Sequence, residues 1–433
     1  MRTSASDRDD QTRARRVYLY FGPLTLLVYL VDPSSQLLDI ATAYMMKNQL
    51  HADAGQVAMF RLVTAMPVYA AFVFGFARDR WNLFGLRDRG QFLAFAPVTA
   101  ATFIWLALAP LSYSGLLLGM LLVMVVSRFL LAAHQGLIAL IGQEQLMSGR
   151  LSVLWNILSF LPLAAGSFAA GYLTEHVAPR STFLIMASLS LLIAVYGFLR
   201  PAAVFSHAYE QPLALTSDLV GDVRRLLRHR AIYPAILIML MFQFSPGSNT
   251  VLQFYLTDEL HASDAAYGYW NGIFLVAFLP VFLLYGRLCK RVPFGRLLWW
   301  GTAISVPQMM PLVFIHSTSA ALWLAVPIGM MGGIMFAAIY DLAMRSCPPG
   351  LQGTLMMLVA GVYALATRAG DLLGTWIYAG NPGHGFLYCA LATTAVYAAI
   401  LPVILLVPRE LLATADGEPN PESDAPVGAE VAG

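Results

Sequence analysis

Eight ionisable side chains interrupt stretches of this sequence that are otherwise apolar. A charged group inside a lipid bilayer is costly unless it is paired, hydrated or bound to a ligand, so each of these residues needs such an arrangement. Groups of this kind can bind a charged solute, and they can exchange a proton when their partners change. The eight are Asp32, Asp39, Arg61, Arg128, His134, Asp341, Arg368 and Asp371.

Two pairs of charges are spaced so that each shares one face of a helix. Arg368 and Asp371 are three residues apart, and Asp341 and Arg345 are four apart, which are the spacings of neighbours on a helix surface. The first pair is either a local ion pair or part of a solute site. The second lies near the end of its apolar stretch and is either a gate or a structural bridge.

The elements that position these charges are expected to be membrane-spanning helices. Hydrophobic residues make up 58% of the chain and charged residues 12%, whereas soluble proteins have about 25% charged residues. Several charge-free runs reach the roughly 20 residues that a spanning helix needs, and they do not alternate in polarity as barrel strands do. We place twelve spans in an all-α membrane protein, at 17–48, 55–77, 91–110, 113–141, 151–174, 181–200, 231–257, 265–286, 296–315, 318–345, 353–378 and 384–408.

Basic residues predict the orientation of the chain. With the N-terminus in the cytoplasm, 21 of the 26 lysines and arginines fall in inner segments, and only Lys47 and Arg180 fall outside. This bias favours both termini inside. No removable signal peptide is apparent. We expect a multi-pass protein of the cytoplasmic (inner) membrane of a bacterium.

Three repeated features indicate an internal duplication. Gly75 and Gly286 are 211 residues apart, Gly85 and Gly295 are 210 apart, and the tripeptide Leu-His-Ala at 50–52 returns at 260–262. A shared offset indicates two homologous six-helix bundles, at 17–200 and 231–408. A cytoplasmic segment precedes them at 1–16 and a basic linker joins them at 201–230. The acidic end, 409–433, is expected to be a disordered cytoplasmic tail.

The loop between the second and third spans contains a recognisable pattern. Gly75 is followed by Asp79 and Arg80, and then by Gly85 and Arg87. This pattern, with the two six-span halves, resembles the major facilitator superfamily over about residues 17–408. Within it, DRWNLFGLRDR at 79–89, CPPGLQGTLMML at 347–358 and YMMKNQL at 44–50 are similar to folate–biopterin transporters.

The sequence departs from that subgroup at a few positions. Asn82 stands where the subgroup favours Pro, and Asp88 where it favours Arg. In the fourth span, relatives often have two Asp residues four apart with a Glu five beyond. Here Glu144 remains, and Gln135 and Ala139 occupy the Asp positions. A transport function is compatible with these changes, but they argue against a pterin substrate.

The resemblance implies that the first, fourth, seventh and tenth spans line a central cavity. Asp39, Arg128, Gln243 and Asp341 then belong to its lining. Asp39 and Arg128 form either a coupling pair, in which protonation of Asp39 frees Arg128 to bind a substrate carboxylate, or a fixed ion pair between two helices.

Three further residues are candidates for the same site. His134 has a side chain suited to proton movement, or it is a hydrogen-bonded packing residue. Gln243 begins a polar stripe that Pro246-Gly247 interrupts, and a broken helix would expose backbone groups to a ligand; a simple kink is the alternative. Asn271 lies where the eighth span could flank the cavity.

The loop residues, with Asp79 holding Arg80, Arg87 or a helix terminus, would stabilise the two halves when the cavity faces outward.

These observations together predict a secondary transporter that moves a small organic solute, pterin-like or otherwise carboxylate-bearing, by alternating access and with proton coupling. The alternatives are an efflux transporter of the same fold and a non-transporting assembly protein related to light-harvesting complex assembly factors. No nucleotide-binding loop or hydrolase motif occurs in the sequence. We therefore expect no catalytic residue, metal or cofactor, no nucleic-acid partner and, as the superfamily's default, a monomer.

Overall fold

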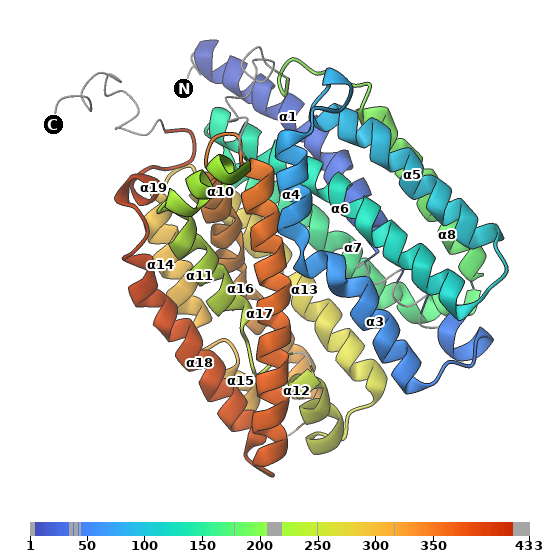
Figure 1. Ribbon diagram of the computed structural model, residues 1–433. Coiled ribbons are helices and arrows are strands. Elements are labelled where there is room, and N and C mark those ends of the chain that lie inside the picture. Colours follow the sequence, from blue (N-terminus) through green and yellow to red (C-terminus); the bar gives the residue numbers. More distant parts are fainter. Residues whose placement is uncertain are drawn as a thin grey trace.

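The computed structural model describes residues 5–33, 38, 42, 45–176, 178–205, 219–248, 250–315 and 317–418. Throughout these residues the regular structure is helical, and no strand occurs in them. The helices run side by side in one bundle (Figure 1). The predicted all-α fold is therefore confirmed.

The first half of the bundle contains one or more helices at each of the first six predicted spans. Its helices are α1 (Ala5–Val31), α3 (Ala54–Tyr69), α4 (Ala71–Arg80), α5 (Asp88–Leu108), α6 (Tyr113–Glu144), α7 (Ser148–His176) and α8 (Pro179–Tyr196). The turn of π-helix η1 (Met45–Gln49) precedes α3, and the short helix η2 (Leu83–Gly85) lies in the loop after α4.

The second half occupies the other six predicted spans in the same way. Its helices are α11 (Ile232–Gln243), α12 (Thr250–Phe254), α13 (Asp264–Leu288), α14 (Phe294–Ser305), α15 (Met310–Val313), α16 (Thr318–Arg345), α17 (Gln352–Gly380) and α18 (Gly385–Ile404), with the π-helix η3 (Tyr255–Glu259) after α12. Two short helices lie outside the spans: α10 (Leu219–Arg228) in the linker and α19 (Arg409–Ala413) after α18.

Seven stretches of the described chain are long and apolar enough to cross a bilayer by length and composition. They are Met59–Arg80, Asp88–Leu108, Tyr113–Glu144, Ala266–Leu288, Thr318–Arg345, Gln352–Gly380 and Gly385–Ile404. The helices Arg180–Tyr196 and Ile232–Gln243 are apolar but shorter. The chain is thus an integral multi-pass membrane protein, and the described helices are consistent with twelve spans.

The repeated tripeptide has the same backbone in both halves. His51 and His261 both adopt a left-handed conformation, with φ of 50° and 52°. In each copy a π-helical hydrogen bond precedes it, from Leu50 N to Met45 O at 3.0 Å and from Leu260 N to Tyr255 O at 3.1 Å. A non-glycine residue seldom adopts this conformation, so its recurrence at an offset of 210 residues supports the duplication.

The seventh span is interrupted between α11 and α12. Helix α11 ends at Gln243, and glycines of α17 make room for the irregular backbone that follows. A Cβ atom on Gly370 would lie 2.7 Å from Ser245 N, and one on Gly374 would lie 2.1 Å from Pro246 O. Both distances are too short for any side chain, so these glycines permit the break.

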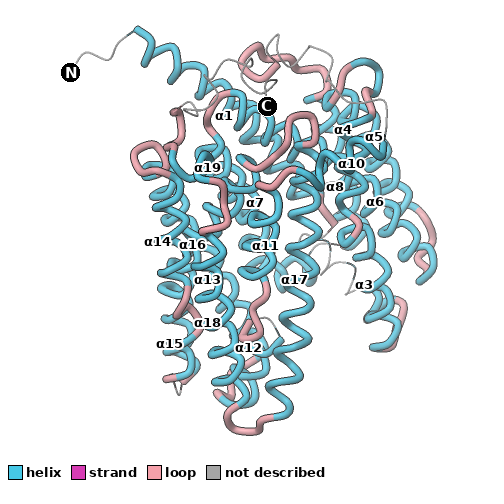
Figure 2. Tube along the Cα trace, turned by 60° about the vertical axis from the view of Figure 1, so that its left-hand side comes forward, coloured by secondary structure: helices cyan, strands magenta, loops and turns pink. Residues whose placement is uncertain are grey.

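The ends of α4 and α16, the starts of α7 and α17, and helices α10 and α19 lie at one end of the bundle (Figures 1 and 2). We call it the basic end, because the arginine-rich segments lie there. Residues 409–418 pack against this end, with Ala415 and Asp416 buried, so the predicted disordered tail is wrong for these ten residues. An acidic composition gave no sign that one of its carboxylates would be buried.

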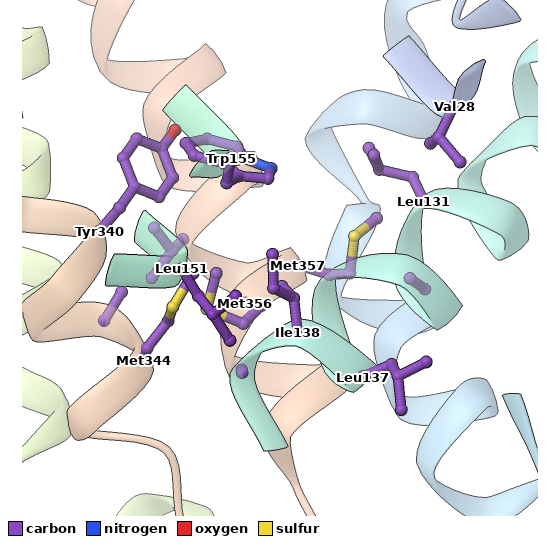
Figure 3. Packing of buried hydrophobic residues seen from close by; sticks show 14 of the residues in the cluster. Val28, Leu131, Leu137, Ile138, Leu151, Trp155, Tyr340, Met344, Met356 and Met357 are labelled. Carbon is purple, nitrogen blue, oxygen red and sulfur yellow. The ribbon is translucent and has the colours of Figure 1, made fainter. Parts of the chain in front are cut away.

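Apolar side chains fill the space between the halves near the basic end. Ile138 of α6 and Leu151 of α7 belong to the same buried cluster as Met344 of α16 and Met356 and Met357 of α17. Figure 3 shows them meeting, with Trp155 beside Tyr340. These apolar side chains fill the contact of α6 and α7 with α16 and α17.

The two halves approach most closely where α4 crosses the start of α17. A Cβ atom on Gly75 would lie 2.2 Å from the carbonyl oxygen of Gly353. Because both residues are glycine, no side chain separates the two backbones, and the helices can approach more closely than usual. This crossing holds the basic end together.

We predict that Gly75→Ala lowers the melting temperature of the purified protein, because the added methyl group forces α4 and α17 apart at a cost of about 1–3 kcal/mol. Thermal unfolding in detergent measures this. The matched control is Gly268→Ala on α13, where a Cβ atom would meet nothing within 4 Å; alanine's better helix propensity should leave its melting temperature equal or slightly raised. Equal melting temperatures for the two variants would contradict the prediction.

Candidate functional site

A cavity of about 500 Å³ lies between the two halves. Its lining comes from the parts of α3, α6 and α17 that are remote from the basic end, together with α12 and α13. The lining residues are Pro33, Thr42, Phe60, Arg61, Thr64, Ala65, Val68, Tyr69, Met120, Met124, Thr250, Gln253, Tyr267, Tyr363, Ala364, Thr367, Arg368 and Asp371. The cavity therefore combines charged, hydroxyl and aromatic groups.

The cavity contains one arginine from each half. Arg61 comes from α3 and Arg368 from α17, and both side chains are exposed. Guanidinium groups bind carboxylates and phosphates in a two-pronged geometry. The sequence predicted that both residues lie inside spans, and in the structure both line the same cavity.

Asp371 holds the broken seventh span. Its two carboxylate oxygens accept hydrogen bonds from Thr250 N at 3.0 Å and Thr250 Oγ1 at 2.9 Å, at the start of α12. Among the described residues, no ion pair joins Asp371 to Arg368. The local pair that their spacing allows is therefore not formed here, and Arg368 faces the cavity.

Arg128 forms an ion pair with Asp32, and both side chains are buried. The pair is next to the cavity, since Pro33 and Met124, one residue and one helical turn away, are lining residues. Asp39, the predicted partner of Arg128, lies outside the described residues. The sequence predicted a pair between the first and fourth spans, and the acid that the structure places against Arg128 is the other aspartate of the first span.

Four of the candidate residues lie away from the cavity. His134 Nε2 is 2.8 Å from Thr25 Oγ1 in a fully buried site, and Gln135 Nε2 donates to Tyr29 Oη at 3.0 Å. Gln243 ends α11 and Asn271 lies on α13, and neither lines the cavity. In this conformation His134 and Gln135 are buried and form hydrogen bonds to side chains of α1.

At the basic end, Asp79 of α4 caps the start of α17. Its oxygens accept hydrogen bonds from Gly353 N at 3.0 Å, from Thr354 N at 2.7 Å and from Thr354 Oγ1 at 2.7 Å. The first N–H groups of a helix lack partners within the helix and attract negative charge. We call this arrangement the Asp79 cap; it joins the first half of the chain to the second.

Arg78, the residue before Asp79 on α4, supports this cap. The Arg78 guanidinium binds Asp79 at 2.7 Å and Asp88 at 2.5 and 2.7 Å, and it lies over Gly136 of α6, where a Cβ atom would be 2.6 Å away. Of the partners predicted for Asp79, which were Arg80, Arg87 or a helix terminus, the structure has the helix terminus. Arg80 instead lies 3.6 Å from Asp222 of the linker helix α10.

The backbone of this loop depends on residues with positive φ. Gly85 has φ of 69° and Arg87 has φ of 50°, and Asn82 Oδ1 accepts a hydrogen bond from Arg87 N at 2.8 Å. Glycine adopts this conformation without steric cost. The role of Gly85 is therefore to turn the chain between α4 and α5.

Asp341 was expected to line the cavity but is not among its lining residues. It lies instead at the basic end, where it forms the local pair with Arg345 that their spacing predicts. Arg345 Nε donates to Asp341 Oδ1 at 2.8 Å, and Tyr285 Oη donates to the other oxygen at 2.9 Å. The Arg345 guanidinium also lies 4.9 Å above the ring of Phe294. These contacts join α13, α14 and α16 within the second half.

The described residues include no group of three His, Cys, Asp or Glu side chains that could hold a metal ion. Cys289 and Cys347 are buried free thiols at the basic end. Burial raises the pKa of both thiols above the ordinary value, so they are poor nucleophiles at neutral pH.

Sequence reasoning missed three charged residues at the basic end. Arg78 lies on α4 and Asp88 begins α5. Both fall within the predicted loop, but a linear pattern does not give the rotation of a helix. Asp416 lies in a segment whose composition predicted disorder. The only available signal was the placement of Arg78 directly before Asp79, where the two can share a partner.

Comparison with known proteins gives consistent results. The sequence model described as Major Facilitator Superfamily matches residues 24–375. The chain is 25% identical to a folate-biopterin transporter of Synechocystis over 377 residues, which cover 81% of this chain and 74% of the relative. It is 24% identical to a probable folate-biopterin transporter 7 of Arabidopsis thaliana, with coverage of 76% and 79%.

A solved structure shows the same fold. The human organic anion transporter MFSD10 (TETRAN) superimposes with a TM-score of 0.64 at 16% identity, over 90% of this chain and 99% of that one. At such identity the likeness concerns the fold alone. The family match spans most of the sequence, and the helical bundle agrees with it: this chain belongs to the major facilitator superfamily, whose members are membrane transporters rather than enzymes.

Proposed function

We propose that this protein transports a small organic anion with a flat ring system, a pterin- or folate-like compound, by alternating access. The observation on which this depends is the cavity of about 500 Å³ between the halves, with Arg61 and Arg368 contributed from opposite sides. Its volume lies in the range of about 300–1,000 Å³ that is usual for small-molecule sites.

The chemistry of the lining supports an anionic aromatic solute. The two arginines supply donors for carboxylates. Tyr69, Tyr267 and Tyr363 supply flat apolar surfaces with a polar end. The names of two relatives, folate-biopterin transporters, agree with a solute of this kind, although the fourth span lacks the acids that the subgroup often has.

The contacts at the basic end support alternating access. The Asp79 cap and the apolar cluster close that end, whereas the cavity lies in the remote part of the bundle. Separation of α4 from α17 would expose the cavity from the basic side, as in a rocking motion of two rigid halves. We place the basic end in the cytoplasm of a bacterial cell, with the protein acting as a monomer.

The buried pair of Asp32 and Arg128 is our candidate for proton coupling. Protonation of Asp32 would leave Arg128 without its counter-charge, next to a cavity that can admit a carboxylate. Release of the proton would restore the pair. A permanent ion pair between α1 and α6 is the competing explanation.

The cavity favours transport over a scaffold function, because a scaffold does not need a wet space with charges from both halves. Import and efflux would use the same cavity and the same closure at the basic end.

We predict that Arg368→Gln lowers folate uptake into proteoliposomes about tenfold at low substrate concentration, the effect of losing one charge-assisted hydrogen bond. Biopterin, which has no carboxylate, should be affected less. Initial rates with labelled substrates measure both effects.

The matched control is Arg287→Gln, the same change at an exposed position outside the cavity, which should transport both compounds normally. Equal folate uptake by the two variants would exclude the binding role of Arg368. Failure of the unaltered protein to transport either compound would exclude the substrate class.

We predict that the double variant Asp32→Asn, Arg128→Gln retains exchange of substrate across the membrane but no longer accumulates it in response to a pH gradient. Removing both charges avoids leaving one of them buried without a partner, which is strongly destabilising. Counterflow measures exchange, and uptake with and without the gradient measures coupling. If the pair merely fastens the helices, exchange and gradient-driven uptake will fall together.

A further inference from the structure

The second half of the chain lacks a carboxylate where the first half has Asp79. Asp79 lies at the end of α4, and the matching end of α13 is followed by Cys289 and Lys290. Cys289 faces α7 much as Asp79 faces α17. A Cβ atom on Gly149 would lie 3.0 Å from Cys289 Cβ, and one on Gly353 would lie 2.8 Å from Asp79 Oδ1. The position on α13 that matches Asp79 therefore offers no carboxylate to the start of α7. The nearest acid of the second half is Asp341, whose Oδ2 would lie 2.9 Å from a Cβ atom on Gly149, but its oxygens accept hydrogen bonds from Arg345 and Tyr285.

Asp416, from the segment after α18, supplies the missing carboxylate. Its Oδ1 accepts a hydrogen bond from Gly149 N at 3.0 Å, the same length as the bond from Gly353 N to Asp79. Its Oδ2 accepts from Arg150 Nε at 2.6 Å, and Arg150 follows Gly149 as Thr354 follows Gly353. In both α7 and α17 the N–H group of the second residue thus donates to a carboxylate from outside the helix. The second carboxylate oxygen accepts from a backbone N–H group in α17 and from the Arg150 guanidinium in α7.

The same segment is also fastened to the second half. Asp416 N donates to Cys289 O at 2.8 Å, and Arg345 Nη2 lies 3.9 Å from Asp416 Oδ1. Thr414 O accepts from Arg345 Nη1 at 3.2 Å and from Phe294 N at 3.2 Å.

The Asp416 carboxylate therefore lies between arginines of both halves, Arg150 of α7 and Arg345 of α16. Its side chain is only 1% exposed. Buried charge pairs of this kind are lost at a high cost if one partner is removed. The segment thus adds charged contacts to both halves, next to the hydrogen bond from Ser152 Oγ of α7 to Ala337 O of α16 at 2.7 Å.

We propose that residues 409–418 form a C-terminal latch that holds the basic end closed, with Asp416 as its essential residue. The latch replaces the acid that the second repeat lacks. It presupposes the motion of the halves proposed above, but it does not depend on the substrate, and its test measures thiol exposure rather than transport.

Two native cysteines report on the latch. Cys289 is in contact with Asp416, since its carbonyl oxygen accepts a hydrogen bond from Asp416 N. Cys347 lies near the Asp79 cap, where its carbonyl oxygen accepts a hydrogen bond from Gln143 Nε2 of the first half at 2.8 Å. Both are buried. Opening of the whole basic end exposes both thiols, whereas local detachment of the segment exposes only Cys289.

The experiment compares full-length protein in lipid nanodiscs with and without Asp416→Asn. Each sample keeps one reporter cysteine, with the other cysteines changed to Ser, and is labelled with a charged maleimide. We expect the labelling rates of Cys289 and Cys347 to rise about tenfold, as for an equilibrium shifted by one charge-assisted contact. Glu410→Gln, a change of the same kind at an exposed position of α19, should leave both rates unchanged.

An increase at Cys289 alone, or at neither cysteine, would overturn the proposal. If Asp416→Asn does not fold, Arg150→Gln removes the partner on α7 and should give the same pattern. A rescue adds specificity: Cys289→Asp in the Asp416→Asn protein returns an acid to the repeat's own position, and the labelling rate of Cys347 should then fall towards the unaltered value. A rate that stays high would also count against the latch.

Discussion

The first N–H groups of α17 lack partners within their own helix, and a carboxylate from the opposite half satisfies them. Much of the structure at the basic end follows from this contact. Gly75 and Gly353 allow the backbones to approach closely enough, and Arg78 offsets the buried charge of Asp79 while Asp88 holds Arg78 in place. A helix terminus attracts a carboxylate only over a short range, so the contact exists in one arrangement of the halves and is lost in any other.

The two ends of the bundle differ in the kind of side chain that lies between the halves. Near the basic end the halves meet through methionine, leucine and isoleucine side chains (Figure 3), with polar contacts mainly at the ends of helices. In the remote part they enclose hydroxyl groups, tyrosines and arginines. Apolar surfaces separate at a cost that grows with their area. Hydrogen bonds and ion pairs, by contrast, are lost over a short displacement. The combination of apolar and polar contacts allows a closed state that is stable and can still open.

The sequence was sufficient for the helical fold and for the spans, because hydropathy over about 20 residues reflects the thickness of the bilayer and needs no knowledge of packing. It also singled out Asp79 and Arg368 as charged residues needing an explanation. It could not pair Arg128 with Asp32, since Asp32 and Asp39 both lie in the first span and only helix rotation decides between them. The burial of Asp416 could not be predicted for a different reason. Composition describes the average of a segment, whereas the order of this segment depends on the contacts of one buried side chain.

Asp371 has a consequence for how an occupied cavity affects the rest of the molecule. Its carboxylate fixes the start of α12 through Thr250, and Arg368 lies one turn away on the same helix. An anion that binds at Arg368 changes the electrostatic environment of that carboxylate, and therefore the strength with which it holds α12. Such coupling is reciprocal. If a bound anion changes the equilibrium constant for the contact between Asp371 and α12, then breaking that contact changes the affinity of the cavity for the anion by the same factor.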